Sequence, residues 1–159
     1  MQQIEMASIN GEFHWARGLT QDLLKDCTES DLNSQLRPEF GPLWKQFRHI
    51  GRVHENYLHA LKTGKVEFGI QNCTYSGGAS REALLGYFDQ LTYRHKLELE
   101  KVRSSLSIDW FGDPTTVLIH VCRLIAHETL HHGQLILCWR ALNKSFPKSW
   151  SSWGEQDKR

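Results

Sequence analysis

The sequence predicts an all-α fold, a four-helix bundle in a single domain over residues 1–159. Four segments carry apolar residues at intervals of three and four positions, which is the period of an α-helix. The stretches between them hold no convincing run of alternating apolar and polar residues that would indicate a β-strand. A chain of 159 residues fits one domain, and four amphipathic helices commonly share one core.

The first two helices are expected over residues 8–27 and 42–62. The apolar stripe of the first consists of Ile9, Phe13, Ala16, Thr20 and Leu23. That of the second consists of Leu43, Phe47, Ile50, Val53, Tyr57 and Leu61. Pro42 suits a first helical turn, where no backbone N–H is needed, and Gly64 suits a left-handed cap that ends the helix.

The third helix is expected over residues 80–105, with Ser80 as its N-cap. The fourth is expected to open with Asp113 as N-cap and Pro114 at the first helical position, and to end near Asn143. The tail over residues 146–154 lacks a helical pattern, and its aromatic side chains are expected to pack back onto the bundle.

Composition and charge narrow the classes of partner. With 19 Lys plus Arg against 18 Asp plus Glu, the formal net charge is +1, so we expect no nucleic-acid partner. No run of about 18 apolar residues exists to span a membrane, and the first residues do not resemble a signal peptide. Because no two of the four cysteines show a paired spacing, we expect free thiols and a cytoplasmic protein.

The strongest chemical signal is the stretch from His127 to His131 in the fourth helix. Two histidines four positions apart lie on one helix face, where their imidazoles can bind one divalent transition metal. The stretch also matches the H-E-x-x-H pattern of zinc proteases. The metzincin branch of that class needs a glycine and a further histidine where this chain has Gln134 and Leu137. The other branch needs a downstream glutamate, and only Glu155 is available.

A third ligand from another helix is therefore the better interpretation, and His49 is the best candidate. It lies beside Phe47 and Ile50 on the second helix, so its side chain can face a neighbouring helix. Metal sites in helical bundles are commonly built from facing helices. The alternative for His49 alone is a hydrogen-bonded histidine of the core.

These motifs resemble the DinB/YfiT-like superfamily. The last helix of that family carries H-x-x-x-H followed by Gly-Gln, as residues 127–134 do here. Its first ligand lies on the second helix in a pattern like residues 47–50, followed by Tyr57. The region around Trp15 and the segment 146–154 also look like members of the family. The resemblance covers nearly the whole chain and implies a DinB-like four-helix bundle, commonly a homodimer.

The resemblance implies His49, His127 and His131 as ligands of nickel or zinc, with manganese also considered. It suggests a metal-dependent S-transferase that joins a low-molecular-weight thiol to a small electrophilic substrate. Two alternatives stay open: a hydrolase that uses metal-bound hydroxide, and a non-catalytic, stress-associated metal-binding bundle.

Four further residues are candidates for the site. Glu128 lies about 100° around the helix from His127 and could be a general base, a carboxylate that supports a ligand, or a solvated group. Gln134, one turn after His131, could hydrogen-bond that ligand. His120 and Trp15 could line a pocket, although the alternative for each is an ordinary core residue.

Overall fold

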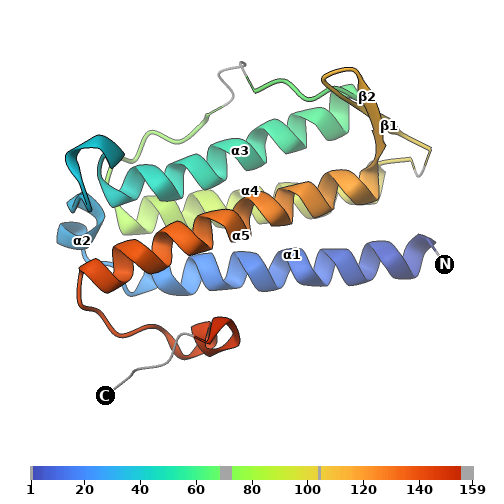
Figure 1. Ribbon diagram of the computed structural model, residues 1–159. Helices are drawn as coiled ribbons and strands as arrows, with labels where there is room; N and C mark the ends of the chain where they lie inside the picture. The colour runs from blue at the N-terminus through green and yellow to red at the C-terminus, as the bar shows by residue number, and fades with distance from the viewer. Residues whose placement is uncertain (1, 69–72, 104, 155–159) are drawn as a thin grey trace.

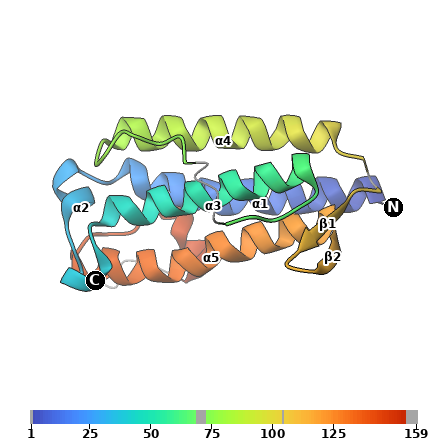
Figure 2. The ribbon, with the colours of Figure 1, turned by 90° about the horizontal axis from the view of Figure 1, so that it is seen from above.

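Four long helices lie side by side in the computed structural model, which describes residues 2–68, 73–103 and 105–154 (Figures 1 and 2). They are α1 (Gln2–Lys25), α3 (Leu43–Thr63), α4 (Arg81–Lys101) and α5 (Val117–Ala141). Helix α1 packs against α4 and α5, and α3 packs against the same two helices. The predicted all-α four-helix bundle is confirmed.

Short elements complete the chain. Helix α2 (Glu29–Asn33) and the 3₁₀ turn η1 (Pro38–Phe40) connect α1 to α3. The strands β1 (Ser107–Trp110) and β2 (Asp113–Thr116) form an antiparallel hairpin between α4 and α5. A second 3₁₀ segment, η2 (Lys148–Trp153), follows α5.

The helix ends show which of the capping residues predicted from the sequence act as caps. Gly64 adopts the left-handed conformation, with φ +74°, and its N–H bonds to the carbonyl of Ala60, as expected of a glycine cap. The Ser80 side chain accepts a hydrogen bond from the N–H of Ala83 and caps α4 as predicted. Pro42 is the N-cap of α3 rather than a residue of its first turn.

The prediction that α5 begins at Pro114, with no strand before it, is wrong. Asp113 and Pro114 belong to β2, and Thr116 is the N-cap of α5. Between the strands, Phe111 and Gly112 have φ of +55° and +101°, and two positive φ values are what a tight two-residue hairpin turn requires. Each strand has only four residues, which is too short for a clear alternating pattern.

The tail packs back onto the bundle, as predicted. Trp150 is fully buried, and its indole N–H donates to the backbone carbonyl of Leu19 at 3.0 Å. This contact joins the last described segment to α1, so η2 covers one side of the α1 and α5 pair.

The four cysteines, Cys27, Cys73, Cys122 and Cys138, are free, and Cys122 is exposed. Among the described residues, no helix combines the length and the apolar character that a bilayer crossing needs.

Trp150→Ala should lower the free energy of unfolding by about 3–5 kcal/mol, because it removes a large, fully buried side chain together with its hydrogen bond. Trp153→Ala is the matched control in the same segment, since Trp153 is 41% exposed. Urea denaturation followed by circular dichroism measures both. Equal losses in the two variants would contradict the role assigned to Trp150.

Candidate metal centre

Three histidines converge between α3 and α5. His49 comes from α3 and His127 and His131 from α5, and one ring nitrogen from each lies within 4.8 Å of the others. The Nε2 atoms of His127 and His131 are 3.0 Å apart. Two nitrogens that bind one metal at about 2.0–2.1 Å lie about 3 Å apart, so this separation fits a shared ion. The three ligands proposed from the sequence are thus the three that the fold brings together.

Hydrogen bonds fix the proton on His131. Its Nδ1 lies 2.7 Å from the side-chain oxygen of Gln134, which can only accept, so Nδ1 carries the hydrogen. The Gln46 amide of α3 donates to the same oxygen and holds it in place. The Nε2 of His131 therefore presents a lone pair toward His127. Gln134 thus holds the ring of His131 in place, in the way that groups around metal sites commonly hold a ligand.

His127 has a buried Nδ1 with no hydrogen-bond partner among the described residues. Its Nε2 faces the lone pair of His131. A neutral imidazole with the proton on Nδ1 would put two Nε2 lone pairs face to face, which is unfavourable unless a cation lies between them. The donor set of three imidazoles therefore fits a borderline divalent metal such as nickel or zinc.

All three imidazoles favour the neutral form, which metal binding requires. Burial lowers the pKa of His127 to about 4, helped by the neighbouring His131 and His49. Burial also lowers the pKa of His49, with contributions from His131 and from Arg52 and Arg48. Burial lowers the pKa of His131 as well, although its bond to Gln134 opposes the shift.

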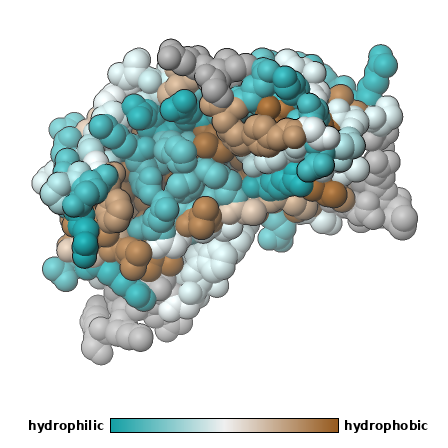
Figure 3. All heavy atoms as spheres, turned by 45° about the horizontal axis from the view of Figure 1, so that its top comes forward, coloured by the Kyte–Doolittle hydropathy of each residue, from teal (hydrophilic) through white to brown (hydrophobic). Residues whose placement is uncertain are grey.

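A cavity of about 590 Å³ opens beside His49 and His131. It lies between the start of α3, the second half of α5 and the segment that holds η1. Figure 3 shows this side of the molecule, where hydrophobic residues lie near the end that carries α2 and also toward the β1–β2 end. Its lining comprises Ser34, Gln35, Leu36, Glu39, Phe40, Gly41, Pro42, Leu43, Gln46, His49, His131, Gln134, Leu137, Cys138, Ala141 and Leu142.

Two predicted pocket residues lie elsewhere. His120 is buried in the core, where its Nε2 contacts the carbonyl of Tyr57 at 3.0 Å and its Nδ1 accepts from Trp110 at 3.1 Å. Trp15 stacks on Trp153, with ring centroids 5.2 Å apart, and does not line the cavity. His120 is therefore the satisfied core residue that the sequence left as an alternative.

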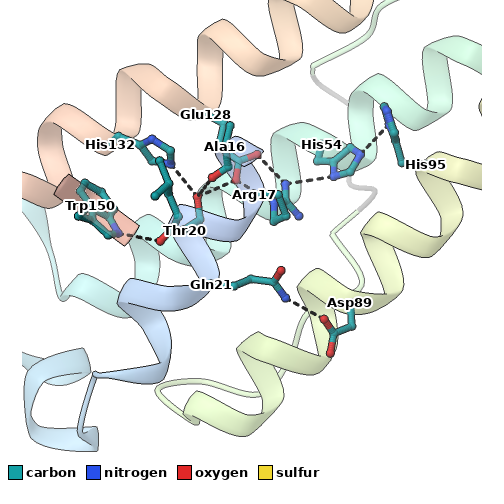
Figure 4. A network of polar contacts seen from close by, with 11 residues as sticks. Ala16, Arg17, Thr20, Gln21, His54, Asp89, His95, Glu128, His132 and Trp150 are labelled. Atoms are coloured by element: carbon teal, nitrogen blue, oxygen red, sulfur yellow. Dashed lines mark hydrogen bonds and ion pairs between the residues drawn. The ribbon is translucent and has the colours of Figure 1, made fainter. Parts of the chain in front are cut away.

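Glu128 is fully buried, which excludes a solvated carboxylate (Figure 4). Arg17 of α1 donates to both of its oxygens, each at 2.8 Å, and the Thr20 hydroxyl donates to Oε1 at 2.7 Å. Burial alone would raise the pKa of this carboxyl, but Arg17 and the hydrogen bonds hold it below its usual value. Both oxygens are thus engaged on the α1 side of α5, and no carboxylate joins the histidine cluster of the described residues. Glu155 lies outside that part of the chain.

The same arginine begins a chain of buried histidines. Its Nη2 lies 3.3 Å from Nδ1 of His54, and Nε2 of His54 lies 3.2 Å from Nδ1 of His95. Burial lowers the pKa of His95 to about 3, with Arg17 the next cause, and drives that of His54 well below its usual value. His54 and His132 are both buried. The other titratable groups near His95 are His14, His120 and Glu128.

Sequence reasoning missed Arg17. The signal that marks it is its place next to Ala16, on the apolar stripe that runs through Phe13 and Thr20. A charged residue on such a stripe needs a buried partner.

Comparisons with known proteins agree with the fold. The sequence matches the DinB superfamily over residues 12–135. A DinB-like protein from Bacillus cereus has a similar structure, with a TM-score of 0.72 and 19% identity over 87% of this chain and 93% of its own. A DinB-like protein from Bacillus subtilis has a TM-score of 0.70 and 17% identity, over 89% of this chain and 97% of its own. No curated protein matches the chain in sequence.

Glu128→Gln should lower the free energy of unfolding by about 3–5 kcal/mol, because it leaves the Arg17 charge without a counterion in the core. Replacing both partners, as in Arg17→Met with Glu128→Leu, should cost less than the single change, since no buried charge remains. Chemical denaturation measures both variants. A single variant as stable as the parent would disprove the structural role of the pair.

The stability of the protein should fall as the pH drops below about 6.5, the pKa of histidine in an unfolded chain. His54 and His95 have lowered pKa values in the fold, so in this range the unfolded chain binds more protons than the native one. The stability that the two neutral rings contribute is fully present above about pH 6.5. As the pH falls toward the pKa of each ring in the folded protein, the free energy of unfolding decreases by up to about 1.4 kcal/mol per pH unit for each ring.

The variant that tests this slope is His95→Gln, which should flatten the decline of the unfolding free energy between about pH 6 and 4. The parent protein provides the reference slope. Identical slopes in His95→Gln and the parent would show that His95 does not titrate on unfolding.

Proposed function

The chain belongs to the DinB superfamily, and we propose that it binds one divalent transition metal through His49, His127 and His131 and acts on a small molecule in the adjacent cavity. The observation that supports this most directly is the convergence of three imidazoles, two of which, His49 and His131, line a cavity of about 590 Å³. Three protein ligands beside an open space are typical of catalytic sites, whereas structural sites are closed by four.

The residues around the site have distinct tasks in this proposal. Gln134 and Gln46 hold the ring of His131 with its Nε2 lone pair free. Three neutral ligands leave the full charge of a divalent ion uncompensated. When bound there, nickel or zinc would supply a positive charge that makes a coordinated water or thiol more acidic.

Thiol transfer is the reaction that we favour. In it a low-molecular-weight thiol loses its proton, its sulfur bonds an electrophilic carbon, and the leaving group departs with the electron pair. Such a transfer needs no separate base once the thiol is acidified. Hydrolysis would benefit from a general base, and the nearest carboxylate in sequence, Glu128, is engaged by Arg17 and Thr20. We therefore propose that Glu128 has a structural role and not a catalytic one.

We further propose, on the strength of the family resemblance, that residues 1–159 form one domain and that the protein is a cytoplasmic homodimer. The four free cysteines support the location, because reduced thiols are usual in that compartment.

Metal analysis of the purified protein tests the first part of the proposal. The parent protein should bind about one equivalent of nickel or zinc, and His49→Ala, His127→Ala and His131→Ala should each abolish tight binding. Gln134→Ala should weaken binding by about 10–100-fold, because it releases the ring of His131. The control is His59→Ala, also on α3 but outside the cluster.

Loaded with nickel, zinc or manganese, the same variants can be assayed with a panel of thiols and electrophiles. We expect conjugation in the parent and none in the variants that lose the metal. Unchanged metal content in His131→Ala would refute the site. A metal-loaded parent that is inactive across the panel would refute the transferase.

A further inference from the structure

We propose that the cavity beside the three histidines selects a substrate whose body is uncharged and largely apolar, and that it disfavours one that carries carboxylates or phosphates. This inference rests on the proposed function, because it concerns the molecule that the metal site would act on. It is supported by two independent properties of the lining, its apolar surface and its distribution of charge.

The lining exposes apolar surface that the fold leaves uncovered. Leu36 is 40% exposed, Phe40 69% and Leu137 58%. The three belong to different elements or loops, yet they meet around one cavity. Exposed apolar residues that occur singly are ordinary, whereas a group around a concave site indicates a ligand that covers it. Leu43 and Leu142 extend the same apolar lining.

The lining also lacks a positive charge. It contains no lysine or arginine, and its single carboxylate is that of Glu39. Lys45 and Arg48, next to Gln46 and His49 in sequence, are not part of the lining and lie over the Trp44 ring, at 5.8 and 5.2 Å from its centroid. An anionic group in the part of the cavity away from the metal would lose its hydration without a lysine or arginine of the lining to pair with, which disfavours such a ligand.

Uncharged polar groups can still be bound. Ser34, Gln35 and Gln46 provide hydroxyl and amide groups along the wall, which can hydrogen-bond a neutral substrate. The volume of about 590 Å³ falls within the range of small-molecule sites, so there is room for a body beyond the reacting group.

Linear hydroxamic acids test this inference, because the hydroxamate binds the metal and the chain extends into the cavity. We would measure the affinity of the zinc-loaded protein for acetohydroxamic acid, for the six-carbon hydroxamic acid, and for a six-carbon chain that ends in a carboxylate. Each methylene that becomes buried should tighten binding about fourfold. With two to three of the four added methylenes buried, the six-carbon chain should bind about 10–100-fold more tightly than the two-carbon one, and the terminal carboxylate should remove that gain.

Two leucines of α5 give matched variants. Leu137→Ser changes a residue of the cavity. It should reduce, several-fold, the ratio of the affinity for the six-carbon hydroxamic acid to that for acetohydroxamic acid. Leu130→Ser changes an equally exposed leucine two turns earlier, outside the lining, and should leave the ratio as it is in the parent. Affinities that do not depend on chain length, or a carboxylate chain that binds as tightly as the plain one, would overturn the inference.

The failure of the proposed function would look different. In that case the protein would take up no metal, or acetohydroxamic acid would not bind the loaded protein. Primary amides with the same chains, titrated into metal-free protein by calorimetry, then test the cavity alone. The gain with chain length and the loss with a terminal carboxylate should persist there, and their absence would refute the inference independently of the metal.

Discussion

The buried pair of Arg17 and Glu128 is the interaction on which the rest of the structure depends. It joins α1 to α5 through two charge-assisted bonds of 2.8 Å in a region without solvent. Glu128 follows His127 directly in the sequence, so the bonds that fix the carboxylate also fix the rotation of α5. One face of this helix, the fixed face, is thereby held against α1 (Figure 4). The adjacent working face, about 100° around the helix, carries His127 and His131, which converge with His49 of α3.

The same division of α5 appears one turn later, where the fixed face bonds to α1 and the working face meets the cavity. His132 bonds to Thr20 and accepts from Trp153, while its neighbour His131 points to the cavity. Because the polar groups on the fixed face hydrogen-bond one another, burying them in the core costs little free energy. On the working face, the Nε2 atoms of His127 and His131 face each other at 3.0 Å. The core histidine His120 differs, since its two ring nitrogens contact the Trp110 indole and the Tyr57 carbonyl.

The helices and the three histidines could be predicted because their signals are local. A period of 3.6 residues, a glycine at a helix end and two histidines four positions apart need no knowledge of distant residues. The hairpin before α5 was missed because Asp113 and Pro114 also resemble a helix start and each strand is short. Arg17, Glu128 and His54 were missed or misplaced because charge usually indicates the surface. Their partners lie up to 111 positions away, which no local pattern reveals.

The contacts of α1 with the end of the chain have a consequence for synthesis on the ribosome. Helix α1 emerges first, but Arg17 finds Glu128 only after 111 further residues, and Leu19 receives the Trp150 bond after 131. Contacts between such distant segments slow folding, because a long loop must close before they form. The nascent α1 therefore displays an unpaired cation on an apolar stripe until α5 has been synthesised, a state in which chaperone binding would be favoured.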